Sequence, residues 1–433
     1  MNKWYIGIDI AKEKFDAALL HADKGCIKHA VFEQNYEGFH GLLKMVKQHC
    51  ENPDQVWIGM ESSGHYHYNL FEFLREKLTP NITILNPMII AKYCKVTLRP
   101  CKTDKKDAVK IARYLVETKV KPTVPSKVLQ QLSYYDKERE HYVTRLAECK
   151  VKIRSWLALG FPELEREIVS LSSRYLITFL EEFPSAPSVT AMSRRHFIKR
   201  FHEMLPAKTK NMNLKPEEVY SLAKRSIGRE FEGYRKLFRT TIEIMYTLKK
   251  TVQTLEQEQK QLCTKHYPLQ MAIVQSIPGI GPISVVSILS HLPAIENFES
   301  HRKVIAFVGT DPVIRQSGKY QGRGRISKKG NPHLRRRLYL CSLRAIQTDG
   351  VFKDYYHRLR EKGRPARVAL IAVANKLLKI LYALLSKKEM FDANYHQRFI
   401  TQSHSNLKNV SQTGEKGYKK TPTLSPKSHK STV

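Results

Sequence analysis

Four acidic residues in the first quarter of the chain have the residue types and the spacing of a site for divalent metal ions. Asp9 interrupts an apolar run from 5 to 10, and Glu61 ends a second run from 57 to 61. Asp104 and Asp107 are three residues apart, so both project from one face if that segment is helical. Carboxylates are the ligands that Mg²⁺ or Mn²⁺ prefers, and four of them could hold two ions about 4 Å apart on a scissile phosphate.

Each of these acids also has an ordinary structural explanation. Asp9 could form a turn at a strand end, and Asp104 could be a first-turn acid that the helix dipole stabilises. Asp107 could be a solvated charge that pairs with Lys106 or Lys110. However, a lone acid in a buried strand is costly to leave charged and unpaired. The combination of four acids at this spacing therefore favours a metal site over four separate surface charges.

A second set of candidate residues surrounds Ser317, which lies in a basic segment rich in glycine. No acid occurs from Gly318 to Arg337. The Ser317 hydroxyl could be a nucleophile, because adjacent positive charge favours the alkoxide, or the loop could bind nucleic acid without chemistry. Ser327 is a rival whose context favours a turn or the N-cap of a helix over 335–347. The cations that could contact phosphate are Lys319, Arg323, Arg325, Lys328, Lys329, Arg335 and Arg336.

The segment from 276 to 282, Ser-Ile-Pro-Gly-Ile-Gly-Pro, is similar to the turn of a helix-hairpin-helix element. In such an element Gly279 and Gly281 would bring backbone N–H groups at a helix N-terminus to a nucleic-acid phosphate. The alternative is a plain junction between two helices, with glycine for tight packing. His65, just after Glu61, could touch substrate or simply lie on the surface.

The elements that must position these residues change character along the chain. Residues 3–120 have an α/β pattern, in which three strands, a helix and then alternating strands and helices give the order of an RNase H-like fold. The expected strands are 3–10, 15–20, 28–33, 55–60 and 81–86, and the expected helices are 40–50, 66–77 and 104–118.

The rest of the chain is expected to be mainly helical. Long charged helices are predicted over 129–159 and 229–266, and near-heptad spacing of apolar residues from Leu248 to Leu262 favours a coiled coil. The proline-containing stretch 183–210 suggests an irregular insertion. The tail after 402 is too polar to bury a core and is expected to be disordered. The predicted parts are a catalytic domain 1–125, a helical coiled-coil middle 126–270, a mainly α C-terminal domain 271–395 and a tail 396–433.

Charge and cysteine content narrow the class of partner. Lys and Arg number 74 against 40 Asp and Glu, a formal charge of +34. The simplest explanation is a polyanionic partner, because neutralising phosphates releases condensed counterions. We expect no membrane segment, and no apolar run as long as the roughly 18 to 20 residues of a spanning helix. The seven cysteines form no CxxC pair, which favours a reducing cytoplasm and argues against a zinc site.

Taken together, these motifs are similar to those of a known family. The chain resembles the DEDD transposases of the insertion-sequence 110 family, which also includes the Piv/MooV DNA invertases. The segments 7–12, 60–66 and 102–108 resemble its N-terminal RuvC-like signature, and 277–281 and 316–318 resemble its C-terminal transposase domain. These five motifs occur in the family's order.

The resemblance implies a role for each matching residue. Asp9, Glu61, Asp104 and Asp107 would be the metal-binding tetrad, with Mg²⁺ or Mn²⁺. Ser317 would form a covalent phosphoserine link to DNA. The resemblance further implies DNA partners (element ends and target), a structured guide RNA in some members, and a homo-oligomer (dimer or tetramer) assembled through the helical middle. Its setting would be the bacterial or archaeal cytoplasm, associated with the nucleoid.

Two alternatives from other classes remain open at the level of sequence. One is a RuvC-like, Mg-dependent junction nuclease in which water attacks and Ser317 only grips phosphate. The other is a non-catalytic nucleic-acid-binding protein in which the acids have no catalytic role. The large second half of the chain argues against the first, and the intact set of four acids argues against the second.

Overall fold

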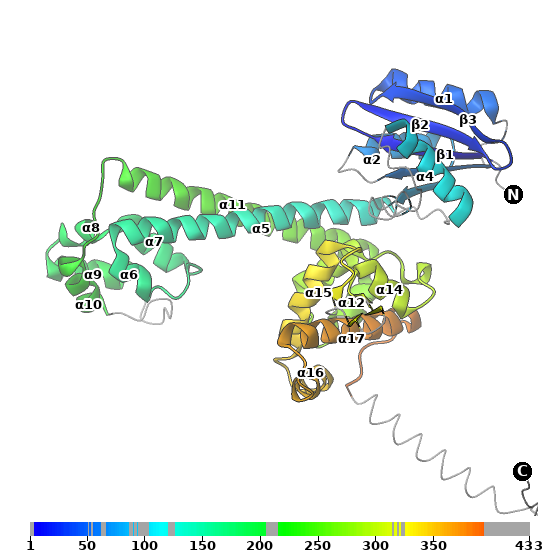
Figure 1. The fold of residues 1–433 in the computed structure, drawn as a ribbon. Helices are drawn as coiled ribbons and strands as arrows, with labels where there is room; N and C mark the ends of the chain where they lie inside the picture. Colours follow the sequence, from blue (N-terminus) through cyan, green and yellow to red (C-terminus); the bar gives the residue numbers. More distant parts are fainter. Residues whose placement is uncertain are drawn as a thin grey trace, which may run out of the picture. The chain divides into compact units, whose positions relative to one another are not determined.

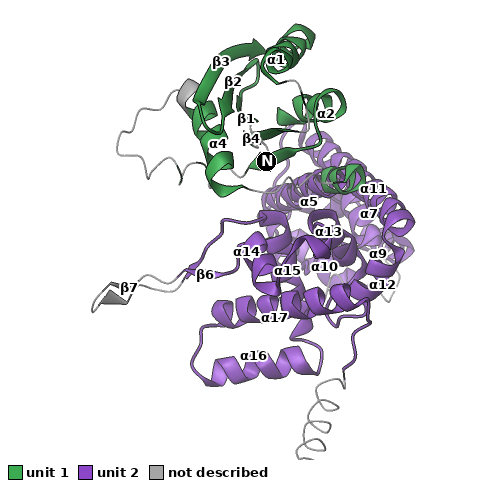
Figure 2. Cartoon of the chain, turned by 90° about the vertical axis from the view of Figure 1, so that its right-hand side faces the viewer, with its two compact units in different colours: residues 1–134 green, residues 135–433 purple. Residues whose placement is uncertain are grey.

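The chain forms two compact units, residues 1–134 and residues 135–433, which Figure 2 distinguishes by colour. The computed structural model describes residues 4–50, 52, 55–61, 66–85, 90, 93, 104–119, 126–204, 215–313, 316–317, 320–321 and 325–393. For residues 104–106, 316–317 and 320–321 the description covers the backbone alone. The predicted tail 396–433 and His65 lie outside the described residues.

A five-stranded sheet in the order β3-β2-β1-β4-β5 forms the centre of the first unit (Figure 1). The strands are β1 (Trp4–Ile10), β2 (Lys14–His21), β3 (Gly25–Glu33), β4 (Val56–Glu61) and β5 (Ile82–Leu85). β1, β4 and β5 are parallel, whereas β2 and β3 are antiparallel to their neighbours. The sequence predicted all five strands, with bounds that differ by at most three residues from those observed.

Helices cover both faces of this sheet. Side chains alternate between the two faces along each strand, so each strand contributes residues to the core on either face. On one face, Ile6 and Ile8 of β1 pack in a core with α1 (Tyr36–His49) and α2 (His67–Lys77). On the other face, Tyr5 of β1 packs with α4 (Asp104–Thr118). α1 begins earlier than predicted because the side chain of Asn35 accepts a hydrogen bond from Gly38 N and caps the helix.

Two long helices, α5 (Lys127–Gly160) and α11 (Tyr234–His266), form what we call the arm. It belongs to the second unit except for residues 127–134 of α5. Near one end, Arg139 Nη1 lies 3.5 Å from Glu256 Oε1, and near the other end Trp156 Nε1 donates to Thr241 Oγ1. Positions on α11 therefore fall as those on α5 rise, so the helices run antiparallel. The two long helices that the sequence predicted are therefore confirmed, and a coiled coil between them stays a prediction.

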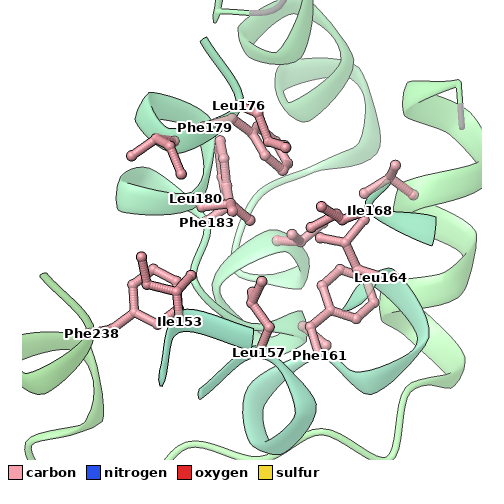
Figure 3. Close-up of a cluster of buried hydrophobic side chains, with 14 of the residues drawn as sticks. Ile153, Leu157, Phe161, Leu164, Ile168, Leu176, Phe179, Leu180, Phe183 and Phe238 are labelled. Atoms are coloured by element: carbon pink, nitrogen blue, oxygen red, sulfur yellow. The ribbon is translucent and has the colours of Figure 1, made fainter. Parts of the chain in front are cut away.

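Residues 162–225 form a helical module at one end of the arm. Its helices are α6 (Pro162–Glu167), α7 (Arg174–Glu182), α8 (Ala186–Thr190), α9 (Arg194–Met204) and α10 (Pro216–Arg225). Phe179 of α7 packs in a buried cluster with Leu157 of α5 and Phe238 of α11 (Figure 3). The predicted irregular insertion over 183–210 is therefore wrong for 183–204. Pro187 begins a helix instead of breaking one, since it stands in the first turn of α8 behind the capping side chain of Ser185.

Six helices follow the arm and form a terminal bundle. They are α12 (Pro268–Gln275), α13 (Pro282–His291), α14 (His301–Val308), α15 (Pro332–Ala345), α16 (Val351–Glu361) and α17 (Ala366–Lys387). A short 3₁₀ helix, η2 (Ile295–Asn297), precedes α14. Between α14 and α15 the strands β6 (Pro312–Val313), β7 (Gln316–Ser317), β8 (Tyr320–Gln321) and β9 (Arg325–Ile326) form two small antiparallel pairs.

α17 is the one helix in the described part of the chain that is long and apolar enough to cross a membrane. The expectation that no apolar run reaches this length was therefore wrong. α17 has 22 residues and packs against α14, α15 and α16. Eight of its residues are buried, including Val373, Leu377 and Leu381, at the spacing of one helix face. This burial is typical of the central helix of a globular core.

Candidate active site and nucleic-acid interface

Asp9 and Glu61 occupy neighbouring positions at one edge of the sheet. In the parallel pair β1–β4, Ile8 is opposite Met60, so the next residue on each strand is an acid. Because neighbouring strands in register place corresponding side chains on one face, both carboxylates belong to the face that α4 covers. Both residues are half-buried, and both make interactions. Two acids from strands that are about 50 residues apart in sequence are thus brought together by strand register.

Two glycines, each two residues before one of these acids, allow α4 to pack closely against this face of the sheet. Gly7 and Gly59 are opposite each other in the β1–β4 pair, each two residues before an acid. A Cβ on Gly7 would lie 2.1 Å from the carbonyl oxygen of Ala108, and a Cβ on Gly59 would lie 2.8 Å from Leu115 Cδ1. The backbone of α4 therefore touches the sheet where side chains are missing. The sequence signal of this contact is a Gly-x-acid pattern that occurs on both strands.

The first turn of α4 carries the other two predicted acids. Asp107 directly precedes Ala108, whose backbone contacts Gly7. Asp104 begins the helix three residues before Asp107, about 4.5 Å along the axis. Asp9 is two residues beyond Gly7, about 7 Å along β1. The Asp107 carboxylate pairs with Lys110 Nζ at 2.8 Å, as one of the alternatives proposed. The Asp104 side chain is outside the described atoms, and among the side chains that are described no group of three forms a metal site.

A buried Asp16–His29 pair adjoins Asp9 and was not foreseen. Asp16 of β2 is directly opposite Asp9 in the antiparallel pair, so it lies on the same face. Its carboxylate is 7% exposed and lies 2.8 Å from His29 Nε2 of β3. Polar residues on this face therefore continue from Glu61 on β4 to Asp9 on β1, Asp16 on β2 and His29 on β3. Asp16 looked like any polar residue in a short strand, which is why the sequence did not single it out.

Ser317 lies in a small antiparallel pair, where β7 places it opposite Tyr320. The base of this segment is held by β6–β9 and by a hydrogen bond from Lys328 N to Gly309 O. The side chains of Ser317, Lys319 and Arg323 lie outside the described atoms. Ser327 does not cap the following helix: its hydroxyl donates to the Asp311 carboxylate, and Asn331 caps α15 instead. Of the two expectations for Ser327, the N-cap is wrong because Asn331 directly precedes Pro332, where α15 begins. The turn agrees with a hydrogen bond from Lys329 N to the Ser327 hydroxyl at 3.4 Å.

The turn from 276 to 282 joins α12 to α13, as expected for a hairpin of two helices. Gly279 has a φ of +88°, and a Cβ there would lie 2.5 Å from the Cα of Ala345. Close packing against α15 thus explains Gly279. Gly281 has no atom within 4 Å of the corresponding position and caps α13 ahead of Pro282. Of the two glycines, Gly281 is the one whose backbone is open to a ligand.

The predicted phosphate contacts differ in how exposed they are. Arg325, Lys328 and Lys329 are exposed. Arg335 Nη1 donates to Val308 O at 2.9 Å, and burial lowers its pKa. Arg336 Nη1 donates to Glu140 Oε1 at 3.2 Å, yet its side chain is 57% exposed. The exposed cations of this set are therefore more accessible to a polyanion than Arg335.

A buried polar cluster joins the arm to the terminal bundle. The Asp136 carboxylate of α5 is fully buried and accepts hydrogen bonds from Gln259 of α11 at 3.3 Å and from Ser287 of α13 at 2.8 Å. His291 Nε2 lies 3.0 Å from Oδ2, the oxygen that Ser287 also contacts, and Arg139 Nη2 lies 3.3 Å from Oδ1. Burial opposes ionisation, but the bonds with His291 and Ser287 and the charge of Arg139 hold the pKa of Asp136 well below its usual range.

Two models of known protein families match this chain, one over its N-terminal part and one over its C-terminal part. A model of DEDD transposases of the insertion sequence IS110, described as a transposase, matches residues 6–162. A second model, described as the transposase IS116/IS110/IS902 family, matches residues 271–357. The first match contains the four acids, and the second contains Ser317 and the 276–282 turn. Most of the helical module lies between the two matches.

Individual relatives agree with these matches. The pilin gene-inverting protein of Moraxella lacunata is 23% identical over 402 residues, which cover 92% of this chain and 100% of the relative. The uncharacterized 43.6 kDa protein of insertion element IS110 from Streptomyces coelicolor is 21% identical over 67% of this chain and 72% of the relative. The transposase of element IS1111A from Coxiella burnetii is 32% identical over 27% of this chain and 33% of the relative.

Proposed function

The chain belongs to the IS110 family of transposases, and from this premise we propose that it cuts and rejoins DNA with a carboxylate metal site and a serine nucleophile. That the protein is a DNA transposase or recombinase follows from its family. The tetrad and the serine are the proposal. The observation that carries it is the register of β1 and β4, which sets Asp9 beside Glu61 where the first turn of α4 reaches the sheet.

We assign the first unit to the RNase H-like, RuvC-like class. Its support is the strand order with three parallel strands and an antiparallel hairpin at one edge, covered by helices on both faces. In the second unit we propose that the α12–α13 turn is a helix-hairpin-helix element whose Gly281 backbone faces phosphate. The open surroundings of Gly281 support that assignment.

The residues of the first unit fit a divalent ion. Asp9, Glu61, Asp104 and Asp107 supply hard oxygen donors, which suit Mg²⁺ or Mn²⁺ better than a soft metal. Such ions supply charge stabilisation at the phosphate and activation of an attacking oxygen. The protein's own part is to hold the carboxylates in place through the contact of Gly7 and Gly59 with α4. Asp107 would have to leave its ion pair with Lys110 in order to bind a metal ion.

We propose that Ser317 exchanges one phosphate ester for another. Its Oγ attacks the phosphorus and loses its proton, a bond from phosphorus to serine forms, and the bond to the departing sugar oxygen breaks as that oxygen takes up a proton. A sugar hydroxyl of another strand then attacks the phosphoserine and restores the serine. No net oxidation occurs, and the number of phosphodiester bonds is conserved. The basic surroundings Arg325, Lys328 and Lys329 favour both the alkoxide and the phosphate.

Trapping the covalent intermediate tests the serine. Wild type incubated with element-end DNA and Mg²⁺ should give a denaturation-resistant protein–DNA adduct, and Ser317→Ala should give none. Strand exchange should fall by at least about 10³-fold, as when other nucleophiles are removed. Ser327→Ala is the matched control, since its hydroxyl bonds Asp311 and should leave the adduct in place. Nicking by wild type without any adduct would instead support the water-attack nuclease.

Isosteric replacement of the acids tests the metal site. Asp9→Asn and Glu61→Gln keep the shape of each side chain but remove a charged ligand. Loss of several kcal/mol of charge stabilisation should slow strand cleavage at least about a hundredfold and leave DNA binding intact. Asp23→Asn, an exposed acid of the same unit, is the control. Calorimetry with Mn²⁺ reads out metal binding independently of cleavage, and unchanged Mn²⁺ binding in both variants would contradict the assignment.

We further propose DNA element ends and target as substrates, a structured guide RNA as partner, a homo-oligomer, and action in the bacterial or archaeal cytoplasm near the nucleoid. The formal charge of +34 supports a polyanionic partner, and the arm offers a surface for assembly. Sequencing of RNA that co-purifies with the protein tests the guide, for which one discrete structured RNA is expected. Light scattering at several concentrations tests the oligomer, which a monomeric mass would contradict.

A further inference from the structure

A cavity of about 650 Å³ opens on the terminal bundle beside the base of the Ser317 segment. Its walls come from α14, α16 and α17 and from the residues that lead into β6. The polar side chains that matter here are His301, Arg302, Tyr355, Asn375, Lys376 and Lys379. None of them belongs to the candidate contacts identified from the sequence.

The cavity collects positive charge that the protein does not neutralise. Arg302, Lys376 and Lys379 form no ion pair within the described part of the chain. Lys376 is half-buried, with its ammonium 4.7 Å from the centre of the Tyr355 ring. Burial and the charges of Arg358 and Lys379 lower the pKa of Lys376, against the opposing charge of Asp354. Cations held together at an electrostatic cost indicate that an anion is the natural occupant.

The acid that lines the cavity is already engaged. The Asp311 carboxylate accepts a hydrogen bond from the Ser327 hydroxyl, and its backbone carbonyl accepts one from Ser327 N at 2.9 Å. Asn375 bonds to Thr310 through both its amide oxygen and its amide nitrogen. These contacts tie the cavity wall on α17 to the chain that enters the Ser317 segment. The cavity and that segment therefore share one rigid base.

We propose that this cavity binds backbone phosphates of the DNA strand that the Ser317 segment engages. This inference rests on the proposed function and extends it. Pro312 lines the cavity and is five residues from Ser317, so an extended chain separates their Cα atoms by at most about 18 Å. At about 3.4 Å per nucleotide along a B-form strand, that distance corresponds to roughly five nucleotides. Arg302 and the two lysines thus hold the strand within a few phosphates of the reacting one, and Tyr355 offers a ring for stacking.

A charge-matched pair of variants tests the site in the full-length protein. Arg302→Ala/Lys379→Ala removes two cations from the cavity on α14 and α17. Lys303→Ala/Lys387→Ala removes two exposed cations from the same helices outside this cavity. Both doubles lose the same net charge, so a difference between them reports position. Thermal melting checks that each double variant is folded.

Affinity is measured by fluorescence anisotropy without metal, on a mixed-sequence DNA duplex of about 40 base pairs and on RNA of the same sequence. The cavity variant should bind DNA roughly tenfold more weakly, and the slope of log affinity against log salt should be shallower by about one per removed cation. The control should change less than about threefold. Equal losses in both double variants, or a loss confined to RNA, would overturn the proposal. Because no cleavage is involved, failure of the serine chemistry leaves these outcomes unaffected.

Discussion

The buried Asp136 carboxylate gives the sharpest prediction at the scale of a single residue. Asp136→Ala removes the shared acceptor of Gln259 and Ser287 and leaves Arg139 with Glu256, 3.5 Å away, as its acidic partner. Breaking a buried ion pair on one side costs about 3–5 kcal/mol of unfolding free energy. Urea unfolding measures the loss. Glu148→Gln, in an exposed pair with Arg145 on the same helix, should change stability by less than about 1 kcal/mol, and an equal effect would refute the argument.

What could be foreseen about residues depended on their local context. Asp9 and Glu61 were identifiable because a charge that interrupts or ends an apolar strand is conspicuous. Asp136 was not, because it sits among many charges in a long helix, and its burial depends on α11 and α13, which lie over a hundred residues away. The same limit applies to the cations of the cavity, which two separate helices bring together.

At the scale of elements, the contact of α4 with the sheet predicts a sensitivity to added methyl groups. Gly7→Ala would place a Cβ 2.1 Å from the Ala108 carbonyl oxygen, so α4 must move. Overpacking of this kind costs about 1–3 kcal/mol, and the shift would also carry Asp107 away from β1. We expect a lower melting temperature together with weaker strand cleavage. Gly281→Ala meets no atom within 4 Å and changes only the N-cap of α13, so it should lower the melting temperature less than Gly7→Ala does.

Periodicity predicted most elements, and the failures have physical causes. Alternation along β1 and heptad spacing along α11 each reflect a single local repeat, so strands and arm helices were found. The helices of 183–204 were missed because Pro187 and Ser185 look like loop residues, although together they start a helix. The row formed by Asp16, Asp9 and Glu61 depends on strand order and register, which no local pattern specifies.

At the scale of the whole second unit, stability should depend on acid. Burial opposes ionisation of Glu140, but the bond from His333 lowers its pKa, as the Asp136 pKa is lowered. Stabilisation from groups with depressed pKa values is complete above the unfolded values of about 4 and is lost as the pH falls through the folded values. Urea unfolding at pH 7 and pH 3 should show a large loss in wild type. Asp136→Asn/Glu140→Gln should lose less, and an equal loss would contradict the assignment.

The two long helices of the arm can also act as a lever between the terminal bundle and the helical module. α5 has 34 residues and α11 has 33, so each is about 50 Å long. The Asp136 cluster grips them near one end, and the helical module 162–225 is fixed at the other. From Asp136 to the end of α5 at Gly160 the helix axis is about 36 Å long, so a rotation of about 10° at the cluster would sweep the module through about 6 Å. A small rotation of the buried polar cluster would therefore displace the module far enough to make or break a contact with another molecule.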